Sequence, residues 1–215
     1  MRTLKILKWA QAAGLVWGLV LCLNTSVLAQ EILNPQSKLW LEGNSTLHPF
    51  SITANRVELF VKVTTGQIST ALSPMDWVEK KLVGDFMISI PVAELKSFDP
   101  AMDLNMRTAL KAEHFDAIQY TVKSYELLRD ADGKDPHRVY TKGVLRVAGV
   151  DRAVAVDAAI LPVSNGFRVT GDYEILMRDY GVEPPSFFFI FNVENQIRVR
   201  FDMQIEKSQG GLYEK

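Results

Sequence analysis

Near the C-terminus, apolar and polar residues alternate strictly over ten positions, and no other feature constrains the fold as strongly. The apolar set is Ile197, Val199, Phe201, Met203 and Ile205, and the polar set is Gln196, Arg198, Arg200, Asp202 and Gln204. A helix would spread both sets around its surface, whereas a strand sends successive side chains to opposite faces of a sheet. The segment therefore predicts a long strand with one buried face and one solvated face.

The same alternation recurs upstream. Further strands are expected at residues 38–43, 57–63, 82–90, 118–122, 139–147, 154–160 and 167–177. Their connections favour antiparallel pairing, because Asn165-Gly166 is a strong hairpin signal, Asp130 to Pro136 reads as a polar hairpin loop, and Gly149 to Arg152 reads as a tight reversal. The sequence thus predicts an all-β domain of about eight antiparallel strands.

One segment departs from the alternation. Residues from Asp103 to Ala112 are good helix formers and follow Asp99-Pro100, so one short helix is expected there. Eight antiparallel strands form either a closed barrel or a two-sheet sandwich, and the interior of an eight-stranded barrel holds side chains or one small ligand. Gly84, Gly143 and Gly171 fall in the inward sets, where they serve either sheet bending or space for a ligand.

The first 29 residues have the pattern of a secretory signal peptide. Three basic residues, Arg2, Lys5 and Lys8, precede a largely apolar and uncharged stretch from Trp9 to Leu23. Small or branched residues then lead to Ala29, after which cleavage is expected. The alternative is an uncleaved membrane anchor, but the apolar stretch is shorter than the roughly 20 residues that a spanning helix needs.

Cleavage would leave one domain, residues 30–215, in the periplasm or outside the cell. The single cysteine, Cys22, would be removed with the signal, so the mature domain would hold neither a disulfide nor a thiolate ligand. Loss of the three basic residues would change the net charge from −1 to −4. No stretch concentrates Lys and Arg, which argues against nucleic acid as a partner.

Five landmarks, in this order and spacing, resemble the YceI-like family. They are residues 40–48 (Trp-Leu-Glu-Gly-Asn-Ser-Thr-Leu-His), residues 84–97 from Gly-Asp-Phe to the Ser after Glu-Leu-Lys, residues 105–120 from the helix to Ala-Ile-Gln-Tyr, residues 142–150, and residues 177–182 (Met-Arg-Asp-Tyr-Gly-Val). The resemblance covers the chain from about Trp40 to Lys207. It implies a lipocalin-like barrel in an exported protein that holds a long apolar lipid, such as a polyisoprenoid, an isoprenoid quinone or a fatty amide.

Inward positions near the helix or the aromatic loop are the candidate ligand contacts. On alternation and resemblance together, they are Phe86, Ile88, Tyr120, Val156, Tyr173, Ile175 and Phe201. The aromatic run that contains Phe187 and Phe188 either plugs the barrel, contacts the ligand, or meets a partner or membrane. His48 either fixes a turn or hydrogen-bonds a polar head group at the barrel mouth.

The sequence contains no pattern typical of a metal site, a catalytic site or a phosphate-binding site. The three histidines are far apart, the acidic residues between Asp130 and Asp135 do not match a calcium loop, and no catalytic or phosphate-binding motif occurs. A non-enzymatic protein without cofactor or metal is therefore expected. The alternative to a lipid carrier is a barrel filled by its own side chains that acts through its surface on a protein partner or in a stress response. A homodimer and a transient membrane contact stay open.

Overall fold

The computed structural model describes residues 28–31, 33–34, 36–63, 72–129, 138–164, 166–187 and 191–206. Its elements are β1 (Leu28–Glu31), β2 (Lys38–Ser45), β3 (Pro49–Ala54), β4 (Glu58–Val63), α1 (Pro74–Glu79), β5 (Val83–Pro91), η1 (Val92–Glu94), β6 (Leu95–Lys96), α2 (Pro100–Ala109), β7 (Ala117–Leu128), β8 (Arg138–Val147), β9 (Val150–Val163), β10 (Gly166–Leu176), η2 (Met177–Tyr180), β11 (Ser186–Phe187) and β12 (Phe191–Glu206). The all-β class predicted from the alternation is confirmed.

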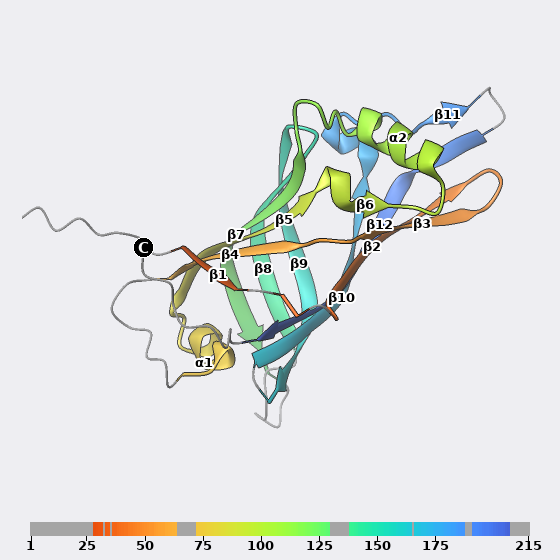
Figure 1. The fold of residues 1–215 in the computed structure, drawn as a ribbon. Coiled ribbons are helices and arrows are strands. Elements are labelled where there is room, and N and C mark those ends of the chain that lie inside the picture. The colour runs from red at the N-terminus through yellow and green to blue at the C-terminus, as the bar shows by residue number, and fades with distance from the viewer. Residues whose placement is uncertain are drawn as a thin grey trace, which may run out of the picture.

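All strand pairs in this part of the chain are antiparallel, and they form one strongly curled sheet (Figure 1). The hydrogen-bonded order is β1-β4-β5-β7-β8-β9-β10-β12-β2-β3-β6, with β11 added to β12. β3 and β4 lie near opposite ends of this order, yet only residues 55–57 separate them in the chain. The sheet must therefore curl until its two ends approach each other.

The predicted count of eight strands was too low. Each of the eight expected strands is present, and β1, β3, β6 and β11 are additional. The hydrogen-bonded path is open, since it starts at β1 and stops at β6, so the sheet is described as a half-barrel. One backbone hydrogen bond of 2.9 Å, from Asn55 N to Glu94 O, continues the β3–β6 pairing by one residue, and the chain itself spans the opening at residues 55–57, between β3 and β4, and at η1, between β5 and β6.

The alternating residues of β12 lie on two different faces of the sheet, one buried and one exposed, as predicted. In β12, Ile197, Met203 and Ile205 are buried, while Arg198 and Arg200 on the other face are exposed. The outer face is held by cross-strand ion pairs between neighbouring strands. Examples are Arg198–Glu174 at 2.6 Å, Arg200–Glu42 at 3.2 Å and Arg146–Asp151 at 2.6 Å. Water screens such exposed pairs, so they contribute little and the inner apolar face supplies most of the stability.

Two of the predicted connections can be compared with the structure. β9 and β10 pair directly, with Gly166 opposite Val163, as the Asn165-Gly166 signal predicts. The reversal between β8 and β9 lies at Ala148 and Gly149, one residue earlier than expected, and both have positive φ, 49° and 81°. Two positive φ values suit the tight hairpin turn that matches strand twist. The predicted loop at residues 130–136 falls outside the described residues.

The described residues contain two α-helices, where the sequence predicted one. The expected helix, α2, begins at Pro100, three residues earlier than expected, because Asp99 accepts a 2.8 Å hydrogen bond from Ala101 N and acts as the N-cap. The missed helix, α1, begins after Ser73, whose side chain forms a reciprocal capping box with Asp76. Figure 1 places α2 beside the β2–β3 hairpin and α1 at the opposite end of the sheet.

Aromatic rings from neighbouring strands occupy the space beside two of the inward glycines. A Cβ at Gly171 would lie 2.8 Å from the ring of Phe201, and one at Gly143 would lie 2.8 Å from the ring of Tyr120 and 2.3 Å from the Thr121 carbonyl oxygen. The predicted space at these glycines is therefore occupied by rings from adjacent strands. Gly84, the third glycine of this prediction, is exposed.

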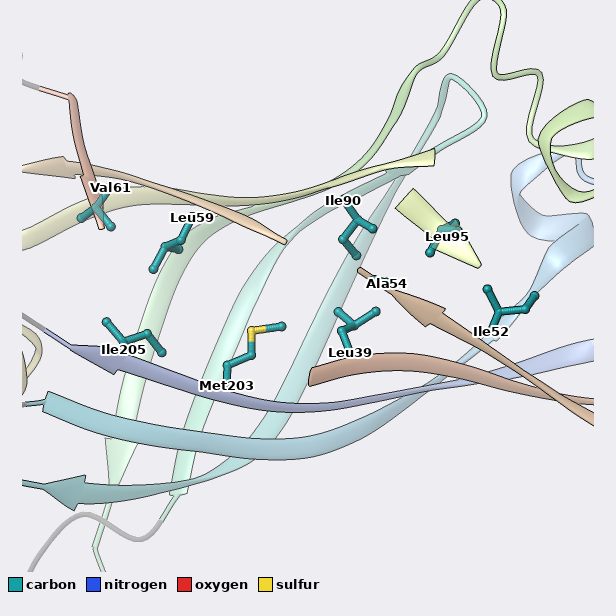
Figure 2. Packing of buried hydrophobic residues seen from close by; sticks show 9 residues of the cluster. All are labelled: Leu39, Ile52, Ala54, Leu59, Val61, Ile90, Leu95, Met203 and Ile205. Carbon is teal, nitrogen blue, oxygen red and sulfur yellow. The ribbon is translucent and has the colours of Figure 1, made fainter. Parts of the chain in front are cut away.

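The largest buried cluster lies where the ends of the curled sheet approach each other (Figure 2). Its side chains come from strands at both ends of the order and are Leu39, Ile52, Ala54, Leu59, Val61, Ile90, Leu95, Met203 and Ile205. Figure 2 shows these side chains directed into the space enclosed by the strands. This cluster stabilises the curl through apolar burial at the point where the hydrogen-bonded ladder stops.

Candidate ligand-binding cavity

The curled sheet encloses a cavity of about 720 Å³. Its wall is built from the inward faces of nearly all the long strands, together with parts of α1 and α2. The lining is overwhelmingly aliphatic and aromatic. A volume of this size falls in the range typical of small-molecule and cofactor sites, about 300–1,000 Å³. The inward positions predicted from alternation thus surround a space that their own side chains do not fill.

Eight of the ten predicted contact residues line this cavity. They are His48, Phe86, Ile88, Tyr120, Val156, Tyr173, Ile175 and Phe201. The other two predicted contacts, Phe187 and Phe188, belong to the aromatic run, whose side chains lie outside the described residues. The backbone of Phe187 belongs to β11, which pairs with β12 through Phe191, and Phe188 lies outside the described residues. Ligand contact by these eight residues stays a prediction.

Polar groups deep in the cavity satisfy one another. The Thr141 hydroxyl donates to Val156 O at 3.2 Å, so the Tyr120 hydroxyl, 2.8 Å away, donates to Thr141 Oγ1. Burial raises the pKa of Tyr120 above its ordinary value, and the phenol therefore stays neutral. Burial likewise raises the pKa of Tyr180, a further lining residue, to about 12. These hydroxyls are neutral hydrogen-bonding groups on an otherwise apolar wall.

The helix α1 covers one end of the cavity. Pro74, Trp77 and Val78 are lining residues, and Pro74 and Trp77 are buried. The Tyr125 hydroxyl, from β7, donates to Val78 O at 3.2 Å and ties the helix to the sheet. The indole N–H of Trp77 is buried without a hydrogen-bond partner among the described residues. No sequence periodicity pointed to this end, although the capping box at Ser73 was a usable signal.

The other end of the cavity is open. Among the described lining residues, only Leu47, His48, Asp99 and Ala101 are exposed. Leu47 and His48 belong to the turn between β2 and β3, and Asp99 and Ala101 belong to the start of α2. We name the gap between these two segments the mouth. It connects the apolar interior to the surface.

His48 takes the turn-fixing role of the two that the sequence left open, and a hydrogen bond from its imidazole to a lipid head group stays a prediction. Its ring nitrogen Nδ1 lies 2.9 Å from Pro49 O, and Ser45 Oγ donates to His48 O at 2.9 Å, so the residue is part of a hydrogen-bonded turn. The same turn places the exposed imidazole at the mouth. Asn105 of α2 also lines the cavity.

A buried carboxylate holds α2 in place beside the mouth. Asp103 accepts hydrogen bonds from Ser97 N at 2.7 Å and from Ser97 Oγ at 2.8 Å, and Lys96 Nζ lies 3.9 Å away. These hydrogen bonds lower the pKa of Asp103, the largest contribution coming from the Ser97 backbone N–H. Sequence patterns mark Asp103 only as part of a helix, because its contact with Ser97 depends on how α2 packs.

This lowered pKa predicts how acid should affect the domain. Because the folded-state pKa lies below the unfolded value of about 3.9, ionised Asp103 stabilises the fold above about pH 4, and this contribution is lost as pH falls through the lowered value. Asp103→Asn should lower the free energy of unfolding by about 1–3 kcal/mol at pH 7. The difference from the wild type should shrink below pH 4.

Urea unfolding at a series of pH values measures this difference. Asp116→Asn is the matched control, because Asp116 is an exposed aspartate near α2. A deficit of Asp103→Asn that is the same at pH 3 and pH 7 would contradict an ionic role for Asp103.

The described residues offer neither a cluster of metal ligands nor a membrane-spanning helix. None of their His, Cys, Asp and Glu side chains gather in groups of three or more that could hold a metal ion. In the same part of the chain, no helix has both the length and the apolar character needed to cross a membrane.

Comparison with known proteins relates this architecture to solved structures. BcnA from Burkholderia cenocepacia aligns with a TM-score of 0.60 at 12% identity, covering 80% of this chain and 98% of that one. A polyisoprenoid binding domain from Saccharophagus degradans aligns with a TM-score of 0.59 at 14% identity, covering 84% and 99%. A YceI protein from Campylobacter jejuni aligns with a TM-score of 0.51 at 16% identity, covering 73% and 85%. At these identities, the alignments show a shared fold.

A search of curated proteins finds no significant match. The model of the YceI-like domain, in contrast, matches residues 42–205, which is most of the chain and includes nearly all of the cavity wall. This chain therefore belongs to the YceI-like domain family.

Proposed function

We propose that the protein is an exported carrier that holds one long apolar lipid in its cavity. The observation that carries this proposal is the apolar cavity of about 720 Å³, covered by α1 at one end and open at the mouth. A lipid chain in such a space leaves water at roughly 25 cal/mol per Å² of buried apolar area. The alternative, a barrel filled by its own side chains, has no support in a cavity of this size.

The lining also favours certain lipids. Asp99 and the imidazole of His48 are the ionisable groups at the mouth, and no Lys or Arg is among the described lining residues. A phosphate or carboxylate head would find no cation there, whereas a neutral head could bond to His48, Asn105 or Ser45. A polyisoprenoid, an isoprenoid quinone or a fatty amide fits this lining. The solved domain from Saccharophagus degradans, described as polyisoprenoid binding, agrees with the first of these.

Two further parts of the proposal concern the mature protein. Cleavage after Ala29 would leave Gln30 and Glu31 of β1, which pair with Phe60 and Leu59 of β4. Export to the periplasm or the exterior would bring the carrier to a space where lipids must cross water. In this form the curled sheet acts as a closed barrel around the lipid, because the short connections from β3 to β4 and from β5 to β6, together with the buried cluster, join its two ends.

Native mass spectrometry of the purified protein tests the proposal. We expect one bound lipid per chain, released as a neutral molecule on activation, or uptake of an added isoprenoid quinone at one equivalent. A protein that contains no lipid and takes up neither quinones nor fatty amides would refute the carrier function. Preferential uptake of free fatty acid would refute the neutral head group while leaving the carrier function intact.

A further inference from the structure

Large apolar side chains stand exposed around the mouth of the cavity. Leu47, in the β2–β3 turn, lines the cavity and is 57% exposed. On the opposite side, Phe98 directly precedes the α2 cap and is fully exposed, and Leu104 in α2 is 59% exposed. We name Leu47, Phe98 and Leu104 the rim. Removing such large apolar side chains from water lowers the free energy, so a surface that buries them would be stabilised.

The rim lies on both sides of the mouth and is continuous with it. Phe98 is next to Asp99, and Leu104 lies one helical turn after Ala101 on the same face of α2. Asp99 and Ala101 are themselves exposed lining residues of the cavity. Figure 1 shows α2 and the β2–β3 hairpin at the same end of the sheet. An apolar surface that touched the rim would therefore also cover the mouth.

We propose that the rim inserts into the surface of a lipid bilayer, so that the mouth opens directly onto the membrane. This inference rests on the proposed carrier function, because a lipid that moves between bilayer and cavity through a docked mouth avoids exposure to water. Separate apolar side chains that project from turns and a short helix suit the fluid interface of a bilayer, which needs no complementary shape. A protein partner would instead require a matched surface of large area.

Charges near the rim predict which membranes it binds. The acidic residues Asp99 and Asp103 are balanced by Lys96 and Arg107 in the same segment, and Lys96 pairs with Asp103. Attraction to anionic lipids requires a cluster of cations, which this segment lacks. Binding should therefore come from apolar insertion, with similar affinity for neutral and anionic vesicles and little dependence on salt.

Vesicle flotation of the purified mature protein, residues 30–215, tests the rim. The probes are vesicles of pure phosphatidylcholine and vesicles with 30% phosphatidylglycerol. The double variant Phe98→Ser/Leu104→Gln removes apolar area without changing charge, and neither residue lines the cavity. The control is Leu128→Gln/Leu161→Gln, which changes two exposed leucines of β7 and β9. We expect the rim variant to lose at least tenfold in vesicle affinity and the control to match the wild type.

Three outcomes would contradict the proposed insertion of the rim into a bilayer. They are equal affinity of the rim variant and the wild type, binding that requires phosphatidylglycerol and disappears at high salt, or a wild-type dimer that the rim variant converts to a monomer without any vesicle binding. Native mass spectrometry of the same samples separates the two proposals. If the wild-type protein carries lipid but does not bind vesicles, only the proposed membrane insertion of the rim is refuted. If the protein contains no lipid, the carrier function is refuted.

Discussion

Val156→Lys is expected to abolish lipid binding, with at least a tenfold loss in the fraction of protein that retains or takes up lipid. Val156 lies in the wall of the cavity, beside the Tyr120–Thr141 hydrogen bond, and its carbonyl accepts from Thr141. In the empty cavity, water can hydrate the new ammonium group. A bound lipid chain would remove that water, and the burial of an unpaired charge costs several kcal/mol.

The matched control uses the same strand. Ala153→Lys places an identical charge on β9 at an exposed position, so it should retain lipid like the wild type. Both variants should keep the β-sheet circular dichroism of the wild type. Because burial lowers the pKa of a lysine, lipid uptake by Val156→Lys should recover partly at high pH. Full lipid retention by Val156→Lys at pH 7 would show that the lipid binds elsewhere.

Leu95→Ala should lower the free energy of unfolding by about 2–5 kcal/mol. Leu95 is fully buried in the cluster that joins the ends of the curled sheet, as Figure 2 shows. It belongs to β6, a strand of two residues, whose pairing with β3 involves only Leu95–Ala54 and Lys96–Thr53. With so few ladder hydrogen bonds, β6 depends on the packing of this one side chain.

Urea unfolding measures the effect, and Leu161→Ala provides the control. Leu161 is 48% exposed on β9, so the same truncation there should change stability by less than about 0.5 kcal/mol. The change in the urea midpoint should occur without a change in slope. A loss below about 1 kcal/mol for Leu95→Ala would mean that the ends of the sheet are held mainly by other contacts.

Local sequence rules predicted the part of this structure that depends on single strands and helix ends. The alternation from Gln196 to Ile205 assigned each side chain to the correct face, because the period of a strand is set by backbone geometry alone. The Asp99-Pro100 cap marks the start of α2 at Pro100, whereas helix propensity alone places that start near Asp103, three residues too late. The capping box of Ser73 and Asp76 is an equally local signal for the start of α1.

Features that join distant segments were beyond such rules. The sequence did not show that Phe201 fills the space at Gly171, since this contact needs the register between β10 and β12. Nor did it show that Leu47 and Phe98 share one end of the molecule, since 50 residues separate them in the chain and only the fold brings their segments together. The role of Asp103 likewise depends on where α2 lies against Ser97.

The sequence by itself thus determined that the chain forms an antiparallel sheet with an apolar inner face, and its landmarks identified the family. The tertiary structure decided whether that inner face encloses a cavity or a packed core. The physical reason is that the direction of a side chain depends on its own backbone, whereas the empty volume depends on the curvature of the whole sheet and on the helices that cover its ends. That volume, about 720 Å³, is the observation on which the proposed carrier function rests.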